Sequence, residues 1–262
     1  MGKQTPVLRG RVSIGARIGR PRSGCRLLAI PEGPAAAYRV AQLDDYGGLS
    51  RRDFLWRAPV GLQVSARVSA PDLPGTWGFG WWNDPFSAQL GIRGTSRRFP
   101  SLPNAAWVFY ASPENHLALR DDHPSDGLLA ATFSAPAIHP AVLALGIPAL
   151  PLLLWPPAAR LIRWLARRFV SEDAAALDLD PTAWHTYEVM WGRSSVSFNV
   201  DGTERFATPV APEGPLGLVI WIDNQYAALR PDGHLSFGSL ANPHAWLEIA
   251  DVELWTGLGG DR

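Results

Sequence analysis

The second half of the chain contains a run of alternating apolar and polar residues broken by tight turns, and this run constrains the fold most. WHTYEVMW (184–191) alternates over eight residues, a Gly-Arg-Ser-Ser turn follows, and VSFNV (196–200) returns. Asp201-Gly202 then provides a tight hairpin turn before TERFAT (203–208). Because alternation with a period of two places successive side chains on opposite faces of a sheet, we predict antiparallel hairpins here.

Other segments of similar length repeat the strand pattern and are separated by turns rich in glycine and proline. These segments are LLAI (27–30), YRVAQL (38–43), LQVSARVSA (62–70), TWGFGWW (76–82), AAWVFYA (105–111), LGLVIWID (216–223) and LEIADVELW (247–255). Short strands at regular spacing predict an all-β fold, an antiparallel two-sheet jelly-roll sandwich that forms one domain over residues 25–255.

The two ends of the chain lack this periodicity. Residues 1–24 are basic and predict a flexible arm, and residues 256–262 predict a short tail. The first residues contain no apolar run of the kind that a secretion signal needs, and Cys25 is the only cysteine, so we expect a cytoplasmic protein. The 24 Lys and Arg residues balance the 24 Asp and Glu residues, which argues against a nucleic-acid partner.

One apolar segment, residues 139–170, interrupts the strands, and we assign residues 139–175 to a helical insertion. Prolines in its first half argue against a continuous helix that spans a membrane. In its second half, a helical wheel places the arginines on one side: Arg160, Arg163, Arg167 and Arg168. The opposite side is apolar and includes Leu161, Leu165 and Phe169, with Trp164 near the boundary.

This helix has two interpretations. It is a surface helix packed over a sheet, with its arginines solvated or paired with the acidic run Glu172, Asp173, Asp178 and Asp180. Alternatively, it lies in a membrane interface and contacts lipid through Leu161, Trp164, Leu165 and Phe169.

The aromatic stretch GTWGFGWWNDPF (75–86) contains the first candidate binding residues. On a strand, Trp77, Phe79 and Trp81 share one face, which we assign to packing between the sheets. Trp82 lies on the other face with two glycines, which would leave space for a planar ligand. Indole rings pack on the faces of sugars, and the side chains of Asn83 and Asp84, which follow directly, can bind hydroxyl groups. The alternative is that these residues are all structural.

The hairpin WHTYEVMWGRSSVSFNVDG (184–202) resembles that of concanavalin A-like sandwiches, especially glycoside hydrolase family 16. LEIADVELW is similar to the closing strand of that family, and PLGLVIWIDN (215–224) stands where the family has a strand of its concave face. WNDPF, AQLDDY and WIDNQYA are similar to segments of an uncharacterised bacterial subgroup. The resemblance covers residues 25–255 apart from the insertion, and it implies a carbohydrate cleft on the concave face.

The resemblance also implies further residues in that cleft: Trp107, His185, Trp221, Asp223 and Asn224. For each of these, a structural role in the core or in a turn is the alternative. Family 16 enzymes carry their carboxylates in a Glu-x-Asp-x-Glu strand, which places them on one face. AAWVFYA (105–111) occupies that place here and contains no carboxylate.

We therefore predict that a Trp-lined concave face binds a carbohydrate or glycolipid without cleaving it. One alternative is a glycoside hydrolase that uses relocated carboxylates, namely Asp84, Glu114 and Asp223. Another is a membrane-peripheral scaffold that uses residues 139–170. We expect no cofactor, although the resemblance allows a Ca²⁺ ion with Asp251 as a candidate ligand.

Overall fold

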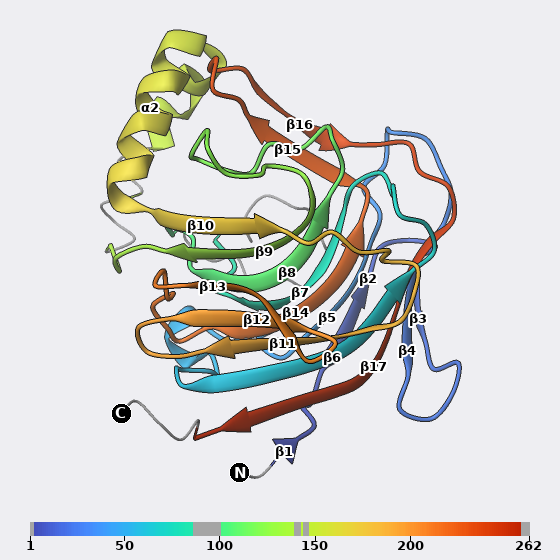
Figure 1. The fold of residues 1–262 in the computed structure, drawn as a ribbon. Helices are drawn as coiled ribbons and strands as arrows, with labels where there is room; N and C mark the ends of the chain where they lie inside the picture. The colour runs from blue at the N-terminus through green and yellow to red at the C-terminus, as the bar shows by residue number, and fades with distance from the viewer. Residues whose placement is uncertain (1–2, 86–100, 139–142, 144–146, 258–262) are drawn as a thin grey trace.

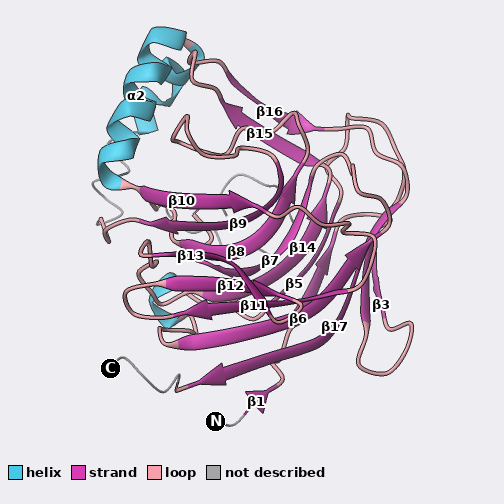
Figure 2. Cartoon of the chain, viewed as in Figure 1, coloured by secondary structure: helices cyan, strands magenta, loops and turns pink. Residues whose placement is uncertain are grey.

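The protein folds into two packed antiparallel sheets with a helix at one edge (Figures 1 and 2). The computed structural model describes residues 3–85, 101–138, 143 and 147–257. In this part of the chain the first sheet has eight strands and the second has seven, and every pairing within them is antiparallel. The predicted two-sheet sandwich is confirmed.

The first sheet contains the hairpins that the alternating sequence predicted. Its order is β13 (Thr203–Thr208), β12 (Val196–Val200), β11 (His185–Trp191), β6 (Val60–Val68), β17 (Ala245–Thr256), β4 (Arg26–Ile30) and β3 (Arg17–Gly19), and β1 (Lys3–Gln4) also pairs with β17. The second sheet has the order β10 (Ser171–Ala176), β9 (Gly127–Ser134), β8 (Ala105–Ala111), β7 (Thr76–Trp82), β14 (Gly217–Asp223), β5 (Val40–Asp44) and β2 (Arg9–Val12).

Smaller elements lie outside the two sheets. They are the hairpin of β15 (Gln225–Leu229) and β16 (Leu235–Ser239), the 3-10 helices η1 (Arg51–Asp53) and η2 (Ile147–Leu154), and the helix α2 (Pro156–Phe169). Figure 1 shows β15, β16 and α2 on the outer side of the second sheet, the side toward which this sheet curves.

The core lies between the sheets, and β7 contributes its largest side chains. Trp77, Phe79 and Trp81 are 1%, 0% and 0% exposed. The ring of Phe79 meets that of Tyr187 at 5.2 Å between centroids, and the ring of Trp81 meets that of Trp191 at 5.6 Å. Alternate residues of β7 therefore pack against alternate residues of β11. The sequence predicted that this face of β7 packs between the sheets, and the burial of all three residues confirms it.

The prediction of a flexible arm over residues 1–24 is wrong for the residues that the structure describes. Three short strands form there, and β2 and β3 extend one edge of each sheet by pairing with β5 and β4. The guanidinium of Arg11 also pairs with the buried carboxylate of Asp44 at 3.0 Å. These residues show no periodicity because they are mostly exposed edge strands, whose order comes from backbone pairing and not from an apolar face.

The helical insertion ends earlier than predicted. Residues 171–176 form β10, an edge strand paired along its whole length with β9, so they belong to the sandwich. The arginines of the helix are not all solvated: Arg163 is 2% exposed and Arg167 is partly buried, whereas Arg160 and Arg168 are exposed. The apolar side is not covered by the sheet, because Leu161 is 56% exposed. In the described part of the chain, no helix is both long and apolar enough to cross a bilayer.

Candidate functional site

Three indole side chains meet on the outer face of the second sheet. Trp82 of β7, Trp107 of β8 and Trp221 of β14 have ring centroids separated by 5.9 Å (Trp82–Trp107), 5.6 Å (Trp107–Trp221) and 6.5 Å (Trp82–Trp221). All three are partly exposed. Phe109 and Phe133 extend this group on β8 and β9, and we call these five residues the aromatic face.

Strand register explains why residues so distant in sequence gather here. Trp107 lies opposite Gly80, and Trp221 lies opposite Gly78, so each large ring has a glycine as its neighbour on β7. The sequence suggested that these glycines leave open space for a ligand, and this prediction is wrong. A Cβ at Gly78 would lie 2.6 Å from the carbonyl oxygen of Val108, so glycine is required by the close approach of β8.

Two of the three indoles are fixed by hydrogen bonds to protein hydroxyl groups. Nε1 of Trp82 donates to the Tyr46 hydroxyl at 2.7 Å, and Nε1 of Trp221 donates to Oγ1 of Thr76 at 2.8 Å. Nε1 of Trp107 is buried and has no acceptor among the described residues. The ring planes of Trp82 and Trp221 are therefore held in place, and their faces are the parts that a ligand could contact.

Asn83 is structural, which corrects its prediction as a ligand contact. Its Nδ2 donates to the carbonyl oxygen of Leu102 at 2.7 Å and to Oγ of Ser101 at 3.1 Å, and its Oδ1 accepts from the Asn104 backbone at 3.0 Å. The side chain is 8% exposed. It ties the end of β7 to the segment that leads into β8, and no polar atom of the amide is left for a sugar.

Asn224 is also structural. It is fully buried, its Oδ1 accepts from the Arg39 backbone at 2.7 Å, and its Nδ2 donates to the carbonyl oxygens of Ala37 and Leu240 at 3.0 Å and 2.7 Å. The predicted contact with a ligand is wrong here for the same reason: the amide joins three segments of the protein.

Asp223 lies beside the aromatic face but is 7% exposed. It accepts hydrogen bonds from the hydroxyl groups of Thr76 at 2.8 Å and Tyr38 at 3.1 Å. Burial raises its pKa to about 6, and the hydrogen bonds only partly oppose that effect. Through Thr76, which also holds Trp221, this carboxyl group helps to position the aromatic face.

Asp84 and Asp223, two of the three carboxylates considered for hydrolysis, lie too far apart to form a catalytic pair. Asp223 pairs with Thr76 at one end of β7, and Asp84 follows the other end of that strand. Eight residues of extended chain correspond to about 26 Å, whereas glycosidases hold their two carboxyl groups roughly 5–10 Å apart. Asp84 is 6% exposed with a φ of 48°, and its carbonyl oxygen accepts from Arg51 at 2.6 Å. Glu114 is exposed in the loop after β8.

His185 and Asp251 lie away from the aromatic face. His185 begins β11 in the first sheet, where its Nδ1 contacts Oδ2 of Asp201 at 2.6 Å and its Nε2 contacts the carbonyl oxygen of Asp180 at 3.0 Å. Asp251 has a φ of 52° where the register of β17 shifts, and its Oδ2 accepts from Ser65 at 3.3 Å. Among the described residues, no three His, Cys, Asp or Glu side chains are grouped in a way that could hold a metal ion.

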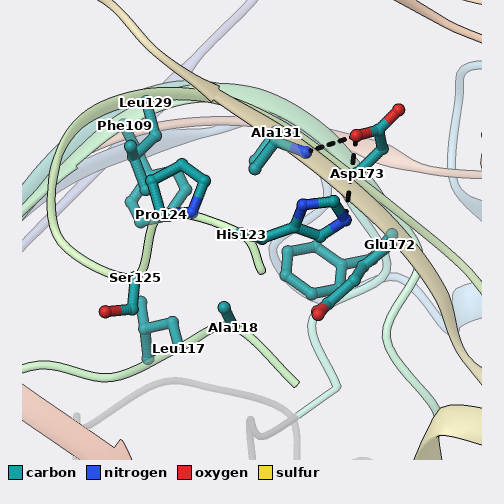
Figure 3. A pocket seen from close by; sticks show the side chains of 12 residues that line it. Phe109, Leu117, Ala118, His123, Pro124, Ser125, Leu129, Ala131, Glu172 and Asp173 are labelled. Carbon is teal, nitrogen blue, oxygen red and sulfur yellow. Dashed lines mark hydrogen bonds and ion pairs between the residues drawn. The ribbon is translucent and has the colours of Figure 1, made fainter. Parts of the chain in front are cut away.

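A small hollow of about 10 Å³ lies at the Phe109 and Phe133 end of the aromatic face (Figure 3). His123 and Glu172 line it. The sequence predicts Glu172 only as an ion-pair partner for the arginines of the helix, and it predicts neither residue as a ligand contact. Glu172 shares its face of the sheet with Phe133, and it accepts backbone N–H groups of Leu119 (at 2.9 Å) and Arg120. Burial raises its pKa. Only the register of β10 on β9 reveals this placement, because SEDAAA carries no alternation.

No family model matches the chain, and no curated protein matches it. Solved structures of similar fold include LamAcat from Zobellia galactanivorans (10% identity, TM-score 0.49, 97% of this chain and 94% of the other). The endo-β-1,4-glucuronan lyase of Trichoderma reesei is also similar (11% identity, TM-score 0.45, 97% of this chain and 91% of the other). So is the carbohydrate recognition domain of Emp47p (11% identity, TM-score 0.43, 95% of this chain and 91% of the other). At this level the likeness concerns the arrangement of the strands alone.

Proposed function

We propose that the aromatic face binds a carbohydrate and does not cleave it. The observation that carries this proposal is the group of three partly exposed indoles within 6.5 Å of one another. Flat aromatic surfaces with a few fixed polar groups are typical of ligand sites, and the C–H faces of sugars pack on indole rings. Because the orientation of two rings is fixed before binding, little side-chain freedom would be lost on complex formation.

The absence of a carboxylate from the outward positions of β8 supports binding without hydrolysis. These positions are Ala105, Trp107, Phe109 and Ala111. Glu172 and Asp173 both line the hollow beside the face. The oxygens of Glu172 accept two backbone N–H groups, and Oδ2 of Asp173 accepts from the Thr208 hydroxyl at 2.6 Å. Because successive residues of a strand point to opposite faces of the sheet, Glu172 and Asp173 do not form the same-face pair that glycoside hydrolysis requires.

A glycolipid is the more specific ligand that we propose. The loop that lines the hollow, which includes Leu117 and His123, is tied by its backbone to α2, whose outer side is apolar. A sugar on the aromatic face and an acyl region beside α2 would then belong to one ligand.

The test is a glycan array followed by titration calorimetry with the glycans that bind. Trp82→Ala should weaken binding at least about tenfold, which corresponds to about 1.4 kcal/mol. The matched control is Trp184→Ala, because Trp184 is also partly exposed but packs near Arg67 on the first sheet. It should leave affinity unchanged.

Three outcomes would contradict the proposal. The array shows no glycan above background, or Trp82→Ala binds as wild type does, or the control loses as much affinity as Trp82→Ala. Release of reducing ends from a bound glycan would instead support the hydrolase alternative. Circular dichroism checks that each variant keeps the sandwich.

A further inference from the structure

The helices η2 and α2 leave many large apolar side chains exposed. Seven large apolar side chains there are between 42% and 74% exposed: Leu152, Leu154, Trp155, Leu161, Trp164, Leu165 and Phe169. We call these residues the apolar ridge. Figure 2 shows α2 at the edge of the molecule, beyond β10 and away from the body of the sandwich. Large exposed apolar patches on a folded protein indicate a binding surface.

The helix cannot turn this side inward, because its arginine side is bonded to the protein. Nη1 of Arg163 donates to the carbonyl oxygens of Ala118 and Leu229, each at 2.7 Å. Its Nη2 pairs with Asp121 at 2.8 Å, and Arg167 pairs with the same carboxylate at 2.6 Å. Nε2 of His116 lies 3.5 Å from Nη2 of Arg163 at the same junction. The exposed position of the ridge is therefore a fixed feature of the fold.

We infer that the apolar ridge inserts into the interface of an anionic lipid bilayer. Its side chains are leucine, tryptophan and phenylalanine, the residues that interfacial helices bury at the boundary between headgroups and acyl chains. Two exposed arginines, Arg160 and Arg168, border it, and the guanidinium of Arg168 lies 4.6 Å from the Trp164 ring centroid. Residues 147–170 contain no Asp or Glu, so every charged side chain of η2 and α2 is positive and complements anionic headgroups.

The same charges argue against a second copy of the chain as the occupant. A two-fold dimer through the ridge would use the same patch on both subunits, so it would bring the arginines Arg160 and Arg168 of both copies into one interface. No acidic residue of η2 or α2 is available to pair with them across such an interface.

The geometry predicts contact with the surface of the bilayer and not a crossing. α2 has 14 residues, which span about 21 Å, and a bilayer core is about 30 Å thick. The helix is also held on one side by the sandwich. It would lie in the plane of the membrane, with Trp164 and Leu161 entering the headgroup boundary.

Vesicle co-sedimentation with the full chain tests this inference. We expect binding to phosphatidylcholine vesicles that contain phosphatidylserine, and weaker binding to phosphatidylcholine alone. Leu161→Ser should weaken binding at least about tenfold, or about 1.4 kcal/mol. Its matched control is Leu55→Ser, because Leu55 and Leu161 are 57% and 56% exposed and Leu55 lies next to η1. Replacing both Arg160 and Arg168 by Ala should remove most of the preference for phosphatidylserine.

Sedimentation of the wild type that is equal with and without vesicles would overturn the inference. So would equal losses in Leu161→Ser and Leu55→Ser. A concentration-dependent dimer that Leu161→Ser abolishes, without any vesicle binding, would assign the ridge to a second copy instead. The test is independent of the carbohydrate proposal, because Trp82→Ala should bind vesicles as wild type does.

Discussion

The arginine beneath α2 provides the sharpest test of how this protein is held together. Arg163 is 2% exposed and donates to two carbonyl oxygens, those of Ala118 and Leu229, at 2.7 Å. Arg163→Met keeps much of the aliphatic side chain but leaves both carbonyls without their charged donor. Each such bond contributes about 1.5–3 kcal/mol, so the two together contribute about 3–6 kcal/mol. The ion pair with Asp121, whose side chain is 52% exposed, adds less than about 1 kcal/mol.

We therefore expect Arg163→Met to lower the free energy of unfolding by about 3–6 kcal/mol in urea titrations followed by near-ultraviolet circular dichroism. If α2 separates as a local unit, the global loss is smaller, and limited proteolysis within residues 156–169 becomes faster instead. The control is Arg160→Met on the same helix, because Arg160 is exposed. It should change stability by less than about 0.5 kcal/mol. A change below about 1 kcal/mol in Arg163→Met, with unaltered proteolysis, would refute the reasoning.

Three further predictions concern the sandwich. Burial raises the pKa of Asp223 to about 6, so the folded protein retains a proton that the unfolded chain releases above about pH 4. Stability should fall by roughly 2–3 kcal/mol from about pH 4 to pH 6 through this group. Asp223→Asn should remove that part of the fall, and superimposable pH profiles would contradict this. Trp81→Ala should cost about 3–5 kcal/mol in urea titrations, because Trp81 is fully buried against Trp191; a loss near 1 kcal/mol would mean that the core tolerates the cavity. Gly80→Ala should cost more in thermal unfolding than Gly127→Ala, because both have positive φ but only Gly80 lies against the backbone of β8; equal losses would show that contact with β8 adds nothing.

The sequence predicted the inner layer well because its signal is local. Alternation with a period of two assigned Trp77, Phe79 and Trp81 to one face of β7, and the structure buries all three between the sheets. The same parity placed Trp82 on the outer face. Its neighbours Trp107 and Trp221 depend on how β8 and β14 pair with β7, which a pattern within one strand does not contain.

The polar candidates failed because their partners are distant in the sequence. An Asn at the end of a strand looks the same in sequence whether it faces a ligand or joins two loops. Asn83 bonds to Leu102, and Asn224 bonds to both Ala37 and Leu240. Each amide is satisfied by segments that only the tertiary fold brings to it, so composition and spacing overestimated the polar part of the site.

The helix shows the same limit most clearly, and it also links the fold to function. A helical wheel divides α2 into a basic and an apolar side, but it does not state which side faces the protein. Carbonyl oxygens of Ala118, in the loop after β8, and of Leu229, at the end of β15, lie far from α2 in sequence and decide that Arg163 faces inward. The fold thereby leaves side chains such as Trp164 and Leu161 in water, where burial would contribute about 25 cal/mol for each Å² of apolar surface. This fold buries a cation and exposes leucine and tryptophan. Its free energy would therefore fall most in an environment that is apolar beside the ridge and anionic at its borders, and a lipid interface provides both.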